Sequence, residues 1–253
     1  MSDTLTNLTI EGLVARLTLN RPDARNALSI SLLESLLTRV GEIGAAATPP
    51  TVLVLAGAGP AFCAGMDLRA VLGDPNAGST LLRLLADLTI RMRNLPVALI
   101  AAVNGAAVGG GCGLACVCDF VLTHDDARLG FPEVDLGVCP AVVAPWVVRR
   151  LGAGRARQVL LGGGVMSGRE AAEIGLATRS VPALADLEPA VAELAQRLSK
   201  AGPLALRQTK LLLNALDGSD DETLVQRGAE LSASVLATTD AQSRLRQRFT
   251  PKA

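Results

Sequence analysis

The chain has 253 residues, with 24 basic and 24 acidic side chains, four Phe, one Trp and no Tyr. This balanced charge and the small number of aromatic rings argue against a nucleic-acid partner, which needs a basic surface for phosphates and rings for stacking bases. The single histidine, His124, excludes sites that need two histidines, and we expect no metal centre.

The five cysteines and His124 are interpreted as structural residues. Three of the cysteines lie within residues 112–118 without CxxC spacing, so we expect buried, small hydrophobic side chains, with a metal or regulatory thiol as the lesser alternative. His124 ends an apolar run and is expected to be a polar residue at a strand end. Residues 1–8 show no secretory leader, which predicts a cytoplasmic protein.

The first half of the chain predicts alternating strands and helices. Residues 8–11 and 14–19 alternate in polarity around Gly12, which is typical of a β-hairpin. A helix should follow, because Ser31 and Glu34 have the spacing of a capping box and the next apolar residues fall on one helical stripe.

Two similar modules come next, each a strand, a glycine-bearing loop and the start of a helix. The first covers residues 51–72 and the second residues 97–119, and strands at 120–124 and 128–131 extend the series. Residues 97–118 are apolar enough to suggest a membrane helix, but five glycines interrupt them. We therefore predict a buried strand, a glycine turn and a buried helix, and no membrane partner.

The last third is predicted to be helical. The expected helices cover residues 154–161, 167–174, 187–199, 204–216 and 222–237, with a Ser167/Glu170 capping box in the second. The basic cluster of Arg149, Arg150, Arg155 and Arg157 is interpreted as a solvated helix face rather than an anion site. Apolar stripes beyond about residue 190 exceed what these helices can bury alone. We expect a core over residues 1–190 and a helical oligomerisation region over residues 191–253.

The two glycine loops and one acid are the candidates for chemistry. Glycine leaves backbone N–H groups accessible, and a helix start adds positive potential, so two such loops could bind one oxyanion. Residues 109–113 do not satisfy GxGxxG, and the alternative is that the glycines only allow tight packing. Glu133 follows a short strand. Its local context alone allows two interpretations: an acid at the protein surface, or a partly buried carboxyl group with a raised pKa.

Four ordered motifs resemble those of the crotonase superfamily, also called the enoyl-CoA hydratase/isomerase family. They are NRPDARNAL at 20–28, GPAFCAGMDL at 59–68, AVNGAAVGGGC at 102–112 and RLGFPEVDLG at 128–137. The resemblance implies an α/β fold with a spiral core of repeated strand-strand-helix units and a C-terminal helical region for trimerisation. It also implies acyl-CoA substrates, no cofactor besides the coenzyme A of the substrate, and a homotrimer or dimer of trimers.

The resemblance also implies roles for individual residues. The N–H groups of Ala64 and Gly110 would donate to the thioester oxygen, and Glu133 would act as general base and acid. Substrate and coenzyme A would contact seven residues: Ala24, Ala64, Gly65, Met66, Asp67, Leu68 and Gly110.

Departures from the family pattern narrow the expected reaction. Many hydratases of the family have a second glutamate where this chain has Gly113, others have an acid where it has Ala141, and its lack of tyrosine excludes tyrosine-dependent members. Residues 136–148 are similar to a hydratase branch that also lacks the second glutamate. We therefore expect a 2-enoyl-CoA hydratase with a single glutamate. The alternatives are a Δ3,Δ2-enoyl-CoA isomerase and a catalytically silent acyl-CoA-binding trimer. The short tail from residue 248 is assigned no role.

Overall fold

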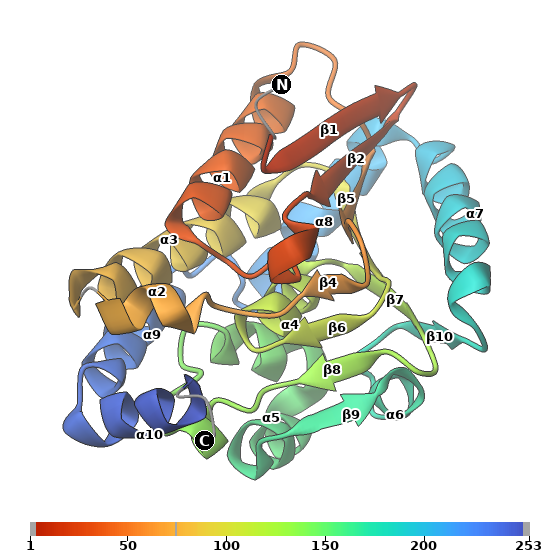
Figure 1. The fold of residues 1–253 in the computed structure, drawn as a ribbon. Helices are drawn as coiled ribbons and strands as arrows, with labels where there is room; N and C mark the ends of the chain where they lie inside the picture. The colour runs from red at the N-terminus through yellow and green to blue at the C-terminus, as the bar shows by residue number, and fades with distance from the viewer. Residues whose placement is uncertain (1–3, 74, 250–253) are drawn as a thin grey trace.

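Two β-sheets form the centre of the fold (Figure 1). The computed structural model describes residues 4–73 and 75–249. The larger sheet has the order β1-β2-β3-β5-β7-β10, with β1 Thr6–Glu11, β2 Val14–Leu19, β3 Val52–Gly57, β5 Ala98–Val103, β7 Phe120–His124 and β10 Arg179–Val181. The smaller sheet has the order β4-β6-β8-β9, with β4 Ala61–Cys63, β6 Ala106–Val108, β8 Arg128–Gly130 and β9 Val165–Ser167. Both sheets are mixed, since β1 pairs with β2 and β8 with β9 in the antiparallel sense.

The chain passes repeatedly from the larger sheet to the smaller one. After a short turn, β3 is followed by β4, β5 by β6 and β7 by β8, and helical segments come next. The expected unit of two strands and a helix is therefore confirmed. Strands β4 and β6 lie where the residues alone predicted glycine loops. Each has three residues, which is too short to show a period in the sequence.

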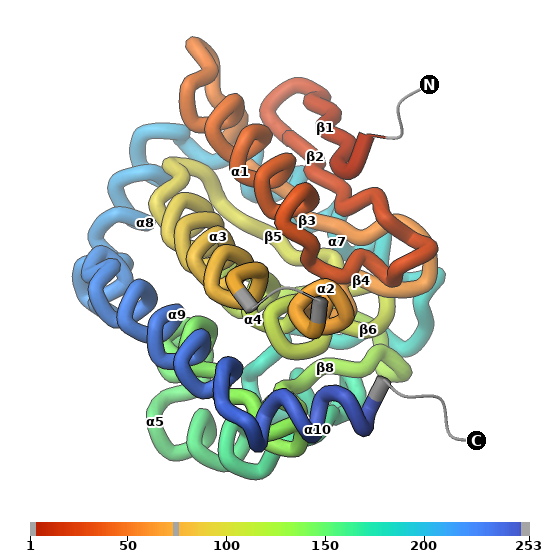
Figure 2. Tube along the Cα trace, turned by 60° about the vertical axis from the view of Figure 1, so that its left-hand side comes forward, coloured from red at the N-terminus to blue at the C-terminus, as the bar shows by residue number. Residues whose placement is uncertain are grey.

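Ten α-helices surround the sheets in the described part of the chain. They are α1 Ile30–Ala45, α2 Leu68–Gly73, α3 Pro75–Asn94, α4 Gly110–Val117, α5 Ala144–Gly162, α6 Gly168–Glu173, α7 Leu187–Ser199, α8 Pro203–Leu216, α9 Thr223–Leu236 and α10 Thr239–Phe249. Short 3-10 helices lie at Pro22–Ala24, Val134–Leu136 and Leu184–Asp186. In Figure 2, α3 lies between α1 and α9, and α10 continues from α9 toward α2. The division expected at residue 190 falls inside α7.

Several sequence expectations about the helices need correction. Helix α1 is capped by Ser29, whose hydroxyl accepts the N–H of Leu32 at 3.2 Å, and not by the predicted Ser31 and Glu34 pair. Helices α3 and α10 were not predicted, and α5 begins ten residues before the expected 154. The Ser167/Glu170 capping box of α6 is confirmed.

The basic cluster is only in part a solvated face. Arg149 donates to the carbonyl of Gly218, and Arg150 donates to the carbonyls of Cys116 and Cys118. Arg155 and Arg157 are exposed, as expected. The guanidinium of Arg149 also lies over the ring of the buried Trp146, 4.8 Å from its centroid. Arg155 also donates to the carbonyl of Ile174 at 2.9 Å, so three of the four arginines join α5 to neighbouring segments.

Most of the apolar residues lie between the sheets and the surrounding helices. Cys63, Cys112, Cys116 and Cys118 are buried there as expected, whereas Cys139 is only partly buried. His124 ends β7 as predicted and is buried, and neither of its ring nitrogens is hydrogen-bonded to residues 4–73 or 75–249. Within the described residues, no helix has the length and hydrophobicity needed to cross a membrane.

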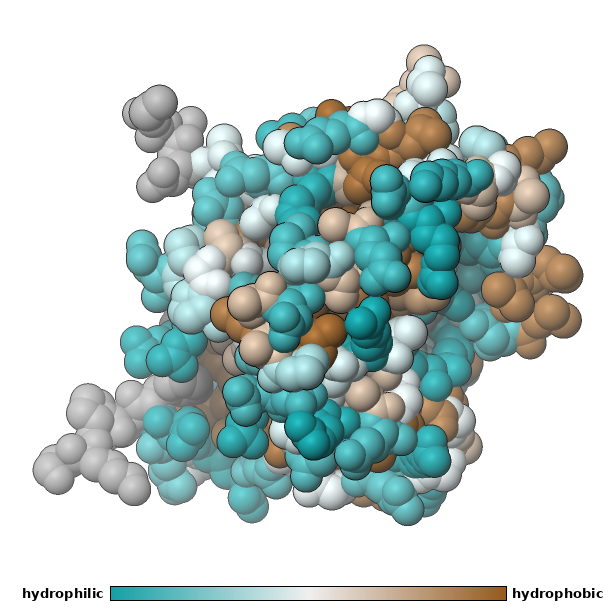
Figure 3. All heavy atoms as spheres, turned by 90° about the vertical axis from the view of Figure 1, so that its right-hand side faces the viewer, coloured by the Kyte–Doolittle hydropathy of each residue, from teal (hydrophilic) through white to brown (hydrophobic). Residues whose placement is uncertain are grey.

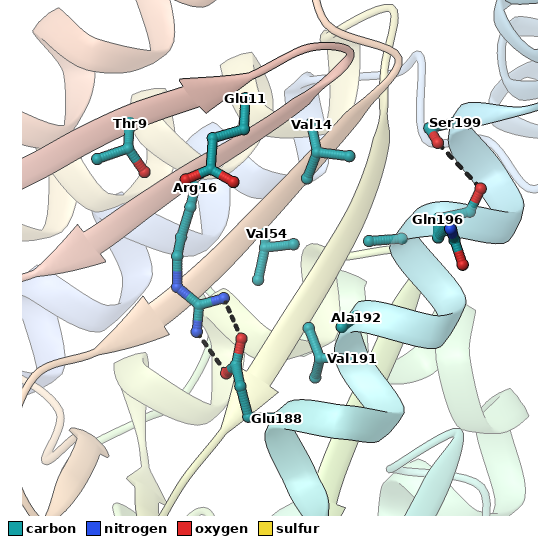
Figure 4. A pocket seen from close by; sticks show the side chains of 11 residues that line it. Thr9, Glu11, Val14, Arg16, Val54, Glu188, Val191, Ala192, Gln196 and Ser199 are labelled. Carbon is teal, nitrogen blue, oxygen red and sulfur yellow. Dashed lines mark hydrogen bonds and ion pairs between the residues drawn. The ribbon is translucent and has the colours of Figure 1, made fainter.

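A cavity lies on the side of the larger sheet that faces α7, between the β1–β2 hairpin and this helix (Figure 4). Arg16 donates two hydrogen bonds to Glu188 across it, at 2.8 and 2.7 Å. Its apolar floor includes Val14, Val54 and Val191. None of the predicted site residues lines this cavity, so it is separate from the candidate site.

Candidate active site

The first glycine loop pairs with the segment that precedes α1. The N–H of Leu28 donates to the carbonyl of Gly65 at 2.8 Å, and the N–H of Asp67 donates to the carbonyl of Leu28 at 3.0 Å. This parallel bridge between Leu28 and Met66 directs the N–H of Met66 away from Leu28. Within residues 4–73 and 75–249 that N–H has no hydrogen-bond partner.

The N–H of Ala64 is already used inside the protein. It donates to the carbonyl of Arg25 at 3.0 Å, because Arg25 and Asn26 adopt left-handed backbone conformations that turn the early loop toward it. The buried side chain of Asn26 holds this loop through hydrogen bonds to the carbonyls of Ala58 and Ala61. The structure therefore corrects the expectation that Ala64 donates to an oxyanion, and it offers Met66 instead.

The second glycine loop lies against the first. Gly109 has φ +54° and precedes α4, so the N–H of Gly110 belongs to the first helical turn, where no partner exists within the helix. A Cβ built on Gly65 would lie 2.7 Å from the carbonyl oxygen of Val108 and 3.8 Å from the nitrogen of Gly110. The two loops thus come together, with Met66 and Gly110 beside each other.

Glu133 lies next to the second loop. A Cβ on Gly109 would be only 2.7 Å from its Oε1 atom, so the carboxyl group occupies the space that a side chain at 109 would need. The Oε2 atom is buried and has no hydrogen-bond partner within the part of the chain that the structure describes. Burial raises the pKa of this carboxyl group from 4.5 to about 7. A group with such a pKa can both take and give a proton near neutral pH.

The surroundings of these groups are apolar. The space in front of Gly110 is bounded by Leu28, Leu85 and Met66. At Gly113 a Cβ would lie 2.2 Å from Cγ1 of Val143, so Val143 already fills the space that a side chain there would need. Glu133 therefore remains the candidate acid of this site, and no three potential metal ligands cluster within the residues described.

The other predicted contact residues are expected to form the rim of the site. Asp67 accepts a hydrogen bond from Arg21 at 2.9 Å, so its carboxylate fixes the early loop. Ala24 ends the first 3-10 helix and Leu68 begins α2, and both are partly exposed. Sequence reasoning missed Arg21 and Asn26, although both lie in the first motif.

The chain is similar to known proteins over nearly its whole length. A family model described as enoyl-CoA hydratase/isomerase matches residues 9–252. The 2,3-dehydroadipyl-CoA hydratase of Escherichia coli is 38% identical over 203 residues, which are 79% of this chain and 78% of that protein. The enoyl-CoA isomerase/hydratase fer4 of Mycosarcoma maydis is 34% identical over 213 residues, which are 79% and 77% of the two chains.

Solved structures agree with these sequence matches. AtuE of Pseudomonas aeruginosa superimposes with a TM-score of 0.80 at 34% identity, covering 94% of this chain and 93% of that one. An enoyl-CoA hydratase from Mycobacterium avium subsp. paratuberculosis K-10 superimposes with a TM-score of 0.86 at 24% identity, covering 95% and 97%. The two mixed sheets and the C-terminal helices thus define an α/β protein of the crotonase fold. The chain belongs to the enoyl-CoA hydratase/isomerase family, whose substrates are acyl-CoA thioesters.

Proposed function

We propose that this protein is a hydratase that adds water across the double bond of a 2-enoyl-CoA, with Glu133 as the single catalytic acid and base. The supporting observation is one buried carboxyl group beside two glycine loops that present the N–H groups of Met66 and Gly110. Ala24, Gly65, Asp67 and Leu68 would contact the substrate at the rim.

The proposed reaction begins when the Glu133 carboxylate takes a proton from water. The water oxygen bonds to C3, and the electron pair of the double bond moves toward the thioester oxygen. The N–H groups of Met66 and Gly110 stabilise the resulting enolate, and each such donor typically contributes about 10²–10³ in rate. Glu133 then returns the proton to C2.

A Δ3,Δ2-enoyl-CoA isomerase is the second candidate. Val143 fills the space next to Gly113, so an apolar wall lies where a second acid would help to hold water. In an isomerase Glu133 would take a proton from C2 and return it to C4, and no water would react. The enolate would use the same two N–H groups.

Replacement of the acid tests the proposal directly. We expect Glu133→Gln to lose about 10²–10⁴ in turnover with little change in coenzyme A affinity, since only proton transfer is removed. For the unchanged enzyme, kcat/KM should rise with pH to a plateau above about pH 7, because the carboxylate is the active form. The assays are hydration of crotonyl-CoA and double-bond migration in 3-hexenoyl-CoA.

The exposed Glu173 provides the control. Glu173→Gln should retain full turnover. Unchanged turnover in Glu133→Gln would refute the assigned role. Binding of acyl-CoA without either product would instead support the silent acyl-CoA-binding trimer.

A further inference from the structure

The loop after the Glu133 segment is held by a helix from far along the chain. Ser232 lies on α9, and its side chain is 0% exposed. Its hydroxyl donates to the carbonyl of Cys139 at 2.8 Å and accepts the N–H of Val142 at 3.2 Å. One hydroxyl therefore joins both ends of loop 139–142 to α9.

Two further contacts hold the loop and the residues just before it. One turn before Ser232, a Cβ on Gly228 would lie 2.3 Å from the carbonyl oxygen of Ala141, so α9 contacts the loop backbone directly. A Cβ on Gly137 would lie 2.7 Å from Cδ of Arg244, which belongs to α10. The position of the loop thus depends on helices that follow it by about 90 residues or more. Figure 2 shows these two helices, α9 and α10, following one another along the chain.

The loop is connected in turn to the catalytic groups. The N–H groups of Leu136 and Val138 donate to the carbonyl of Glu133 at 3.0 and 2.9 Å, so its backbone moves with the start of the loop. At the other end, Val143 follows Val142 and forms the apolar wall beside Gly113. A shift of the loop would displace both the acid and the wall that faces α4.

We propose that Ser232 is a positioning residue, whose hydroxyl fixes loop 139–142 and thereby holds Glu133 against Gly109 in the geometry used for proton transfer. This inference rests on the proposed function, because it assigns Ser232 to the same reaction. Ser232 touches no reacting atom and acts through the loop.

Replacement of the hydroxyl is the first test. Ser232→Ala removes both hydrogen bonds, and we expect kcat to fall about 10- to 100-fold, since small displacements of a catalytic group have effects of this size. KM should stay within about twofold, because the N–H donors are untouched. Ser234→Ala is the matched control: Ser234 is exposed on the same helix and donates only to the carbonyl of Leu231. It should behave as the unchanged protein.

A second measurement does not depend on turnover. Carbon-13 NMR titration of the Glu133 carboxyl should give a pKa of about 7 in the unchanged protein. In Ser232→Ala the pKa should be lower, because a looser loop admits water to the carboxylate. If the unchanged protein converts neither crotonyl-CoA nor 3-hexenoyl-CoA, the proposed function fails. The titration still tests whether Ser232 determines the placement of Glu133.

Gly228→Ala provides an independent displacement of the loop if Ser232→Ala does not fold. Its added methyl would contact the Ala141 carbonyl, so it should lower both kcat and the pKa of Glu133. The proposal is overturned if folded Ser232→Ala matches Ser234→Ala in kcat and in the titration of Glu133. If only Gly228→Ala folds, an unchanged kcat and an unchanged pKa of Glu133 in that variant overturn the proposal.

Discussion

The buried carboxyl group of Glu133 makes the stability of this protein depend on pH. Its pKa is raised from 4.5 to about 7, so between these values the unfolded chain loses the proton while the folded chain keeps it. The free energy of unfolding must therefore fall as the pH rises through this window and level off above it. The packing around the site has to offset this loss in the free energy of unfolding.

Glu133→Gln should remove this dependence. When the pH is raised from 4.5 to 8, the free energy of unfolding should fall by roughly 3 kcal/mol more in the unchanged protein than in Glu133→Gln. Urea unfolding of both proteins at the two pH values measures the difference. Equal losses in the two proteins would show that Glu133 ionises freely in the folded state.

At the residue scale, the sequence identified most of the candidate site but not the orientation of its groups. The glycine loops and Glu133 were found through motifs, and the structure brings them together. The expected donor was Ala64, whose N–H is bonded to the carbonyl of Arg25, whereas the proposed donor is Met66. The direction of these N–H groups depends on the left-handed Arg25, which no pattern in the sequence revealed. Ser232 gave no signal, since a serine inside an apolar helix has no distinctive spacing.

At the scale of elements, a buried ion cluster joins α8 to the larger sheet. The ammonium group of Lys210 donates to the carbonyl of Val97 at 2.8 Å and to Asp119 at 3.0 Å. Asp119 also accepts hydrogen bonds from Arg93 and from the N–H of Leu99. The cluster therefore connects α3, β5, α8 and the turn before β7.

Lys210→Met should loosen this connection. The side chain of Lys210 is 7% exposed, and its loss would leave the Val97 carbonyl unpaired while Asp119 keeps two donors. We expect about 3 kcal/mol of destabilisation, at the low end for breaking a buried pair. Lys200→Met, at an exposed position, should change the free energy of unfolding by less than about 0.5 kcal/mol. Urea unfolding measures the free energy of unfolding of both variants. Equal losses in Lys210→Met and Lys200→Met would contradict a stabilising role for the cluster.

The sequence predicted the long, strongly apolar elements and missed those with mixed signals. Strand β7 covers the expected residues 120–124, and β3 and β5 begin one residue after the expected starts of the two modules, 51 and 97. Helix α3 was missed because its first turns contain Gly78 and Ser79, which are poor helix formers in the interior of a helix. Helix α5 was predicted too short, since Gly152 interrupts it with φ +73°.

At the scale of the whole molecule, α8 presents leucines to solvent. Leu204, Leu212 and Leu216 are 70%, 60% and 74% exposed. Figure 3 shows hydrophobic side chains projecting at one edge of the face that contains α7, on the side where α8 lies. Apolar groups of this kind on one helix are typical of an interface between subunits.

We expect these leucines to be covered in a homotrimer or a dimer of trimers. The double substitution Leu212→Glu and Leu216→Glu should reduce the mass in solution to that of one 26.0 kDa chain, because charge would have to be buried at the interface. Analytical ultracentrifugation measures the mass. An unchanged protein that already sediments as a single chain would contradict the expectation.

The single Trp146 has a practical consequence. It is buried near the start of α5, three residues beyond Val143, and the chain contains no tyrosine. Intrinsic fluorescence therefore originates mainly from one indole ring, on the helix that follows the loop held by α9. A change in its emission on addition of a thioester would record movement of that loop in solution, without an attached dye.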